Sequence, residues 1–217
     1  MIATSPKRLF LFSTENNPIE IYNTIYEEYD TQNYIKAIEL CNTNIKMLYD
    51  SPILPKIEMV KAVSIAKEFG YSKYAEQLKF IKLNYSNSIE AKEAEFIIKN
   101  VLPMLSNTSF LDNDKSDNFK IIYQFSNTAL DETESFVVKI NESINKIEYL
   151  KLNTSKDYYN NIVTFVVLHG LKSYDGAMGL AEMLNKKPDF KNRTSFVVSS
   201  ENYKTIQIHK NLEEYLK

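Results

Sequence analysis

Apolar residues in the first half of the chain recur three or four positions apart, which is the spacing of amphipathic helices. Pro18 suits the first turn of such a helix, because its missing N–H needs no partner there. The segment Asp50–Pro55 interrupts the pattern, since proline cannot continue a helix. Gly70 is expected to cap a helix at its C-terminal end. The pattern therefore predicts helices at about 19–30, 33–49, 55–69, 72–84 and 88–102.

Two of these helices share a small residue close to a tyrosine. Tyr34 precedes Ala37 by three positions, and a tyrosine directly precedes Ala75, with Ile81 six positions further on. The two alanines are 38 residues apart (75 − 37), slightly more than the roughly 34 residues of a tetratricopeptide repeat. An alanine lets two helix backbones approach, and the aromatic ring fills the space beside it. Residues 18–105 are thus predicted to form tetratricopeptide-like antiparallel pairs, with a non-repeating bundle as the alternative.

The pattern changes to strands in the second half. Strands are predicted at 119–125, 147–153, 161–171 and 194–200, with helices at 131–146 and 173–186. This β-α-β-β-α-β order is that of a ferredoxin-like domain. The chain is therefore predicted to be α+β. Its predicted parts are a poorly structured lead-in at 1–17, helical repeats at 18–105, a polar linker at 106–118, and a ferredoxin-like domain with two short terminal helices at 119–217.

Composition argues against several classes of ligand. The net charge is −2, and basic residues alternate with acidic ones along the predicted helices, so nucleic acid is not a predicted partner. The strand VTFVVLH (163–169) also lacks the basic and glycine positions of an RNA-binding RNP1 strand. The chain has 4 glycines, and none begins a G-x-G-x-x-G or Walker motif, so no nucleotide cofactor is predicted. No apolar run approaches the ~20 residues that span a bilayer.

No combination of residues indicates catalysis or metal binding. His169 and His209 are far apart in the sequence, and His169 is expected to be a hydrogen-bonded residue at a strand end. Cys41, the single cysteine, lies in a helical pattern and is predicted to be a small buried apolar residue. The carboxylate runs at 27–30 and 131–134 lie at helix ends, where solvation or the helix dipole accounts for them. No catalytic, cofactor or metal residue is predicted, and the protein is expected not to be an enzyme.

Three segments in this order carry a resemblance to a known family. They are NPIEIYNTIYEEYDTQNYIKAIELCNTNI (17–45), the region 53–105 from ILPKIEMV to NVLPML, and the ending SFVVSSENYKTIQIHKNLEEYLK (195–217). Because of these three segments, the chain resembles the C-terminal part of the SprE/PorW family. The members of this family are tetratricopeptide lipoproteins of gliding motility and type IX secretion in Bacteroidota. The resemblance covers about residues 18–217. Its specificity lies in the order of the pieces, because tetratricopeptide helices alone are common.

The resemblance implies a non-enzymatic scaffold in the periplasm at the outer membrane, with protein partners in the secretion and gliding machinery. Family members are several times longer and begin with a lipidated cysteine after a signal peptide. Neither feature occurs here, and Cys41 is not in a lipobox. We therefore expect this sequence to be a piece of a longer protein.

Two other functions stay open. The segment VVLHGLKSYDGAMGLAEMLNK (166–186) faintly resembles half of a SPOR domain, whose sheet face holds denuded peptidoglycan glycan. A generic helical-repeat adaptor outside secretion is the other alternative.

The end of the chain is the most family-specific piece, yet it follows the predicted β-α-β-β-α-β core. Two helices cover one face of such a sheet. The other face is left open, so it either binds a partner or is covered by another segment of the chain. We expect the segment 200–217 to fold back over this domain or against the helical repeats. The residues expected to form this interface are Tyr203, Ile206, Leu212, Tyr215 and Leu216.

Overall fold

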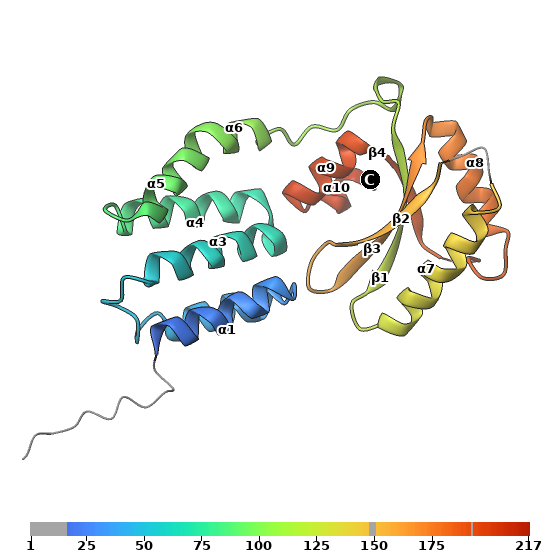
Figure 1. Cartoon of the computed structure of the whole chain (residues 1–217). Helices are drawn as coiled ribbons and strands as arrows, with labels where there is room; N and C mark the ends of the chain where they lie inside the picture. The colour runs from blue at the N-terminus through green and yellow to red at the C-terminus, as the bar shows by residue number, and fades with distance from the viewer. Residues whose placement is uncertain (1–16, 148–150, 192) are drawn as a thin grey trace, which may run out of the picture.

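The computed structural model describes residues 17–147, 151–191 and 193–217, so most of the predicted lead-in lies outside the described residues. The protein is α+β, as predicted. A helical part forms the N-terminal half and a four-stranded antiparallel sheet with helices forms the C-terminal half of what is described. The two parts lie side by side in Figure 1.

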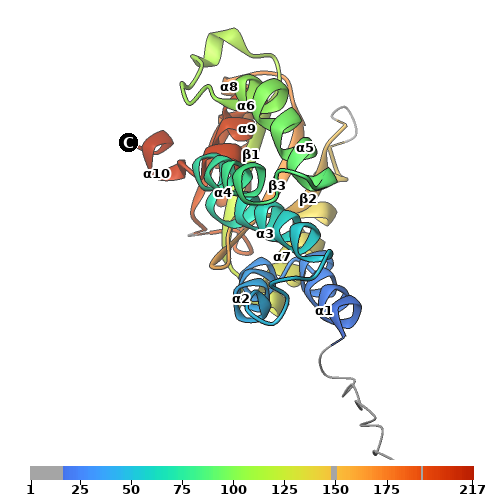
Figure 2. The same cartoon turned by 90° about the vertical axis from the view of Figure 1, so that its left-hand side faces the viewer.

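Helices that alternate in direction make up the helical part. They are α1 (Pro18–Asp30), α2 (Tyr34–Asn44), α3 (Leu54–Phe69), α4 (Tyr71–Asn84), α5 (Ile89–Phe96), the π-helical turn η2 (Ile97–Val101) and α6 (Leu102–Leu105). Each packs against the next, and in Figure 2 the helices of the stack are seen roughly end-on. Gly70 caps α3 as predicted, with φ +78°. Asn17, expected in the lead-in, caps α1 by accepting a hydrogen bond from the Ile19 amide.

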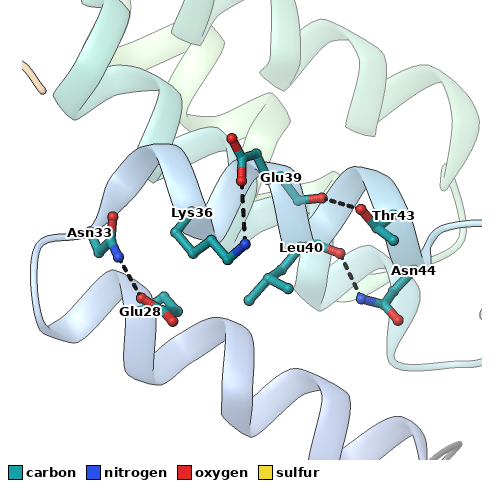
Figure 3. Close-up of polar contacts among 7 residues, drawn as sticks. All are labelled: Glu28, Asn33, Lys36, Glu39, Leu40, Thr43 and Asn44. Carbon is teal, nitrogen blue, oxygen red and sulfur yellow. Dashed lines mark hydrogen bonds and ion pairs between the residues drawn. The ribbon is translucent and has the colours of Figure 1, made fainter.

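Two helices end differently from their predictions. The second stops at Asn44 instead of about residue 49. In its last turn the side-chain amide of Asn44 donates to the Leu40 carbonyl, and the Thr43 hydroxyl donates to the Glu39 carbonyl, each at 2.8 Å (Figure 3). The fifth helix widens into η2 just before Pro103, whose ring and missing N–H disturb a regular α-helix.

The C-terminal half follows the predicted order of strands and helices. It contains β1 (Phe119–Ser126), α7 (Leu130–Ile144), β2 (Asn153–Tyr158), β3 (Val163–Leu171), α8 (Tyr174–Asn185), β4 (Ser195–Ser199), α9 (Ser200–His209) and α10 (Leu212–Tyr215), preceded by the 3₁₀ turn η3 (Asn113–Lys115). The strand order is β2-β3-β1-β4, and all three pairings are antiparallel. The central strands β1 and β3 are mostly buried, which agrees with their continuous apolar sequences.

The sheet has a hydrophobic core on each face. Helices α7 and α8 lie on one side in Figure 1, and their core includes Tyr123, Phe136 and Ile140. The core on the other face joins Phe165 and Val167 of β3 to residues of α9 and α10. The sheet is therefore the middle of three layers.

The strand predicted at 147–153 is wrong in position. Residues 148–150 lie outside the described residues, Lys151 and Leu152 are not in a strand, and β2 begins at Asn153. β2 pairs with β3 from Asn153 opposite His169 to Tyr158 opposite Thr164. It is an edge strand with no fully buried residue, so it lacks the alternating apolar residues on which the prediction relied.

Candidate functional site

The C-terminal segment folds back over the sheet. Tyr203, Ile206 and Leu212 are buried in the core that α9 and α10 form with the sheet. The Tyr215 hydroxyl donates to the Val197 carbonyl of β4 at 3.0 Å. Leu216 is 50% exposed. Of the five predicted interface residues, four thus pack within the chain itself, and Leu216 is the one that faces solvent.

The segment 106–118, which was predicted as a linker, is hydrogen-bonded to α9. The Asn202 side chain accepts from the Leu111 amide at 2.8 Å and donates to the Leu111 carbonyl at 2.9 Å. The rings of Phe110 and Tyr215 pack edge to face, with centroids 5.1 Å apart. Residues 106–118, predicted as a polar linker, contain the short turn η3 and are attached to α9 through Leu111.

A joint between the two parts is formed by Glu68, Gly70, Tyr158 and Asn161. Glu68, in the last turn of α3, accepts a hydrogen bond from the Tyr158 hydroxyl of β2, and its other oxygen accepts from the Asn161 amide at 3.0 Å. Glu68 is 5% exposed, while Tyr158 is half-buried and Asn161 is exposed, so the two bonds are partly shielded from water. They tie the end of a helix to the β2–β3 hairpin.

The turn at Gly70 forms the second contact of the joint. A β-carbon at Gly70 would lie 2.7 Å from the Ile208 carbonyl oxygen, so α9 approaches too closely for any side chain there. The next residue, Tyr71, packs its ring 5.1 Å from that of His209. Glycine is thus required here both by its positive φ and by the close approach of α9.

The four predicted repeat positions have different surroundings. Ala37 and Ile81 are fully buried, whereas Ala75 is half-buried and lines a surface hollow beside Leu102. Tyr34 is buried and meets the Tyr158 ring edge to face at 4.9 Å. Tyr34 therefore contributes to the joint as well as to the helical stack.

A groove crosses α2, α3 and α4 on the surface of the helical part. It has a volume of about 430 Å³, and its wall includes Ile38, Ile65, Phe69 and Phe80. Phe69 is 49% and Phe80 42% exposed. Exposed aromatic side chains gathered in one concave surface are typical of sites that bind another molecule. We call this feature the helical groove.

A buried carboxyl group lies next to the helical groove. Glu58 of α3 is fully buried and accepts a hydrogen bond from Gln77 at 2.6 Å, with the Lys61 ammonium 3.7 Å away. Lys61 and Gln77 both line the groove. Burial raises the pKa of Glu58, against the lowering effects of Lys61 and Gln77. The same burial of this region raises the pKa of the Cys41 thiol to about 12, and Cys41 is a buried core residue as predicted.

A polar network occupies the rim of the sheet beside α9. Lys120 donates to His169 Nδ1 at 3.1 Å, so the neutral ring carries its proton on Nε2 and donates to the Ser155 hydroxyl at 2.8 Å. Ser155 then donates to Asp157 at 2.7 Å, and Tyr203 donates to the other oxygen of Asp157 at 2.6 Å. Burial, followed by the charge of Lys120, lowers the pKa of His169, which agrees with a neutral ring.

In this arrangement His169 is not a general base toward Ser155. Its Nε2 is a donor, and the Ser155 hydroxyl donates to Asp157 instead. The expected role of His169 as a hydrogen-bonded residue near a strand end is confirmed. The network joins three strands to α9 and stabilises the covered sheet face.

Comparisons with models of known protein families, with curated proteins and with solved structures found no match to this chain. Among the described residues, no helix is long and apolar enough to cross a membrane. In the same ranges, no group of three or more His, Cys, Asp or Glu side chains is arranged to hold a metal ion.

Sequence reasoning did not identify the residues of the joint or the buried carboxyl group. Glu58 and Glu68 lie on a predicted helix among alternating charges, a pattern that indicates a solvated face. A weak signal was available: Glu68 is followed two residues later by the glycine that ends the helix, where an acidic side chain opposes the helix dipole. Such a residue needs a partner elsewhere in the fold.

Proposed function

We propose that this protein is a non-enzymatic interaction scaffold, in which the helical groove receives a segment of a partner protein. The observation that carries the proposal is the exposure of Phe69 and Phe80 within one groove. Glu68 and Gly70 hold the end of α3 against the other part of the chain, so the joint fixes the groove relative to the sheet. A scaffold needs such a fixed geometry between its surfaces.

The order of the elements supports the two proposed fold families. Antiparallel helices joined by short turns support tetratricopeptide-like pairs in the first half. The β-α-β-β-α-β order, with both central strands buried, supports a ferredoxin-like domain in the second half. The terminal helices α9 and α10 would then be an addition that covers the face opposite α7 and α8.

The proposed setting is the type IX secretion and gliding machinery, at the periplasmic side of the outer membrane. Its support is the resemblance of residues 17–45, 53–105 and 195–217 to the SprE/PorW family. The scaffold would connect the outer-membrane translocon to periplasmic components. No cofactor or metal is part of this proposal.

The SPOR-like alternative requires a sheet face that is free to hold a glycan strand. The face opposite α7 and α8 is covered here by Tyr203, Ile206 and Leu212, and both sheet faces carry a hydrophobic core. This arrangement argues against glycan binding on the sheet. Sedimentation with purified cell-wall sacculi tests it directly, because a peptidoglycan-binding module would be recovered in the pellet.

Site-specific photo-crosslinking in the source cells tests the proposed function. A photoreactive phenylalanine analogue replaces Phe80 in the helical groove, and Leu130, which is 69% exposed on α7, is the matched control position. We expect Phe80 to give a discrete crosslink to a component of the secretion machinery, and Leu130 to give none. Identical products at both positions, or a groove crosslink to a protein unrelated to secretion, would contradict the proposal.

A further inference from the structure

A cavity between the two parts is separate from the helical groove. It has a volume of about 500 Å³. Ends of helices of the helical part form one side of it, and residues of β2 and α9 form the other. Cavities of this size, located where two parts of a protein meet, are typical small-molecule sites. We call it the joint cavity.

Tyrosine rings form much of its wall. Tyr34 and Tyr158 contribute from the joint, and Tyr71 and Tyr74 contribute from the first turn of α4. Burial raises the pKa of Tyr34 and of Tyr74, so both hydroxyls are protonated donors at neutral pH. The wall thus offers flat apolar faces together with hydrogen-bond donors, which suits a planar ring with a polar substituent.

The charges of the joint cavity are mainly positive. Lys67, Lys156 and Lys210 line it together with Asp157. Asp157 already accepts hydrogen bonds from Ser155 and Tyr203, one on each oxygen. Lys156 is paired with the carboxylate of Glu134. Two of the three ammonium groups, those of Lys67 and Lys210, form no ion pair within the described residues.

Lys210 is the more informative of these two cations. Its ammonium donates to two neutral oxygens, the Tyr159 carbonyl at 2.6 Å and the Gln207 side chain at 3.3 Å. Burial is the main cause that lowers its pKa to about 8. The charge of the Glu68 carboxylate acts against this shift, and the charge of Lys67 adds to it. A half-buried cation that interacts with Glu68 only at a distance, and forms no direct ion pair among the described residues, is stabilised when an anion binds beside it.

From this arrangement we infer that the joint cavity binds a small aromatic carboxylate, with its ring on the tyrosine wall and its carboxylate at Lys210 and Lys67. The same chemistry is presented by a free aryl acid and by the C-terminal residue of a peptide that ends in phenylalanine. The inference is independent of the helical groove and of the proposed secretion partners.

Titration of the intact chain with phenylacetate, followed by calorimetry and by NMR of labelled tyrosines, tests the inference. We expect saturable binding that shifts the signals of Tyr71 and Tyr74, with phenethylamine binding at least tenfold more weakly. A short peptide ending in phenylalanine, with a free or an amidated C-terminus, distinguishes the two sources. Binding of the free-carboxylate peptide but not of phenylacetate assigns the site to peptide ends, and the reverse assigns it to small acids.

Two variants and one control locate the carboxylate. Lys210→Met keeps the aliphatic stem and is expected to weaken phenylacetate at least tenfold. Lys67→Met, at an exposed position that does not endanger folding, is expected to weaken it at least threefold. Lys204→Met changes an exposed lysine of α9 that does not line the joint cavity, and is expected to change affinity less than twofold. The inference is overturned if neither the acid nor the peptide binds, or if all three variants behave alike.

Discussion

The carboxylate of Glu68, in the last turn of α3, accepts a hydrogen bond from the hydroxyl of Tyr158 at the end of β2. Its second oxygen accepts from the Asn161 amide at 3.0 Å. One buried side chain therefore ties the helical part to the edge of the sheet. Hydrogen bonds to a charged group contribute about 1.5–3 kcal/mol each when buried, and less when their donors are partly exposed to water, as they are here.

The first prediction is that Glu68→Ala lowers the free energy of unfolding by about 2–4 kcal/mol, because it removes both bonds and leaves the half-buried Tyr158 hydroxyl without its partner. Urea denaturation measures this change. Glu142→Ala, at an exposed position on α7, is the matched control and should stay within about 0.5 kcal/mol of the wild type. Solution scattering should also show a larger radius of gyration for Glu68→Ala, and an equal loss in both variants would refute the role of the joint.

The second prediction concerns acid pH. The folded-state pKa of His169 lies below its ordinary value, so below about pH 6.5 the unfolded chain takes up a proton that the folded ring resists. Stability that is present above this pH is lost as the pH falls. Because the ring is only half-buried, solvent screens its interactions, and we expect the loss of stability between pH 7 and pH 5 to be small.

The variant His169→Gln removes this titration and can still donate to Ser155. Its unfolding free energy should therefore fall less steeply than that of the wild type between pH 7 and pH 5. Urea denaturation at four pH values across this window measures both slopes. Equal slopes would show that the ring takes up its proton as easily in the folded state as in the unfolded one.

The third prediction is a loss of stability at higher pH, opposite to that for His169, because burial raises the pKa of Glu58. As the pH rises above about 4.5, the unfolded chain loses the proton of this carboxyl group while the folded chain resists that loss, so stability falls. Glu58→Gln does not titrate. Relative to the wild type, its free energy of unfolding should therefore rise as the pH goes from 4.5 to 8. A difference that does not depend on pH would contradict the raised pKa.

Hydrophobic periodicity was sufficient to predict most of the secondary structure. The helices from Pro18 to Asn84 and the buried strands β1 and β3 were found because their apolar residues follow a helical or a continuous pattern. The edge strand β2 was misplaced, because its residues Asn153–Tyr158 are mostly polar and are paired by backbone bonds and by the His169 network. The joint was not predicted, because the partners of Glu68 lie about 90 residues away and no local pattern indicates such contacts.

The same limit applies to Ala37 and Ala75, which the sequence assigns to equivalent repeat positions. Ala37 is fully buried, whereas Ala75 lines a hollow of about 400 Å³ at the surface. The fourth prediction is that Ala37→Leu destabilises by about 1–3 kcal/mol through overpacking. Ala75→Leu should cost less than about 0.5 kcal/mol, because its side chain can extend into the hollow. Thermal unfolding of both variants measures this difference. An equal loss of stability in the two variants would show that Ala37 and Ala75 occupy equivalent positions after all.

The fifth prediction concerns the terminal segment that covers the sheet. Ile206 of α9 is fully buried in the core with Phe165 and Val167, while Leu216 is 50% exposed. Truncation of a buried isoleucine removes apolar contacts and leaves a cavity, so Ile206→Ala should lower the free energy of unfolding by about 2–5 kcal/mol. Leu216→Ala, a change of similar size at the surface of the same segment, should lower it by less than about 0.5 kcal/mol. Urea denaturation followed by circular dichroism measures both. Similar small losses would mean that α9 does not cover the sheet in solution, and the sheet face would then be free for a partner.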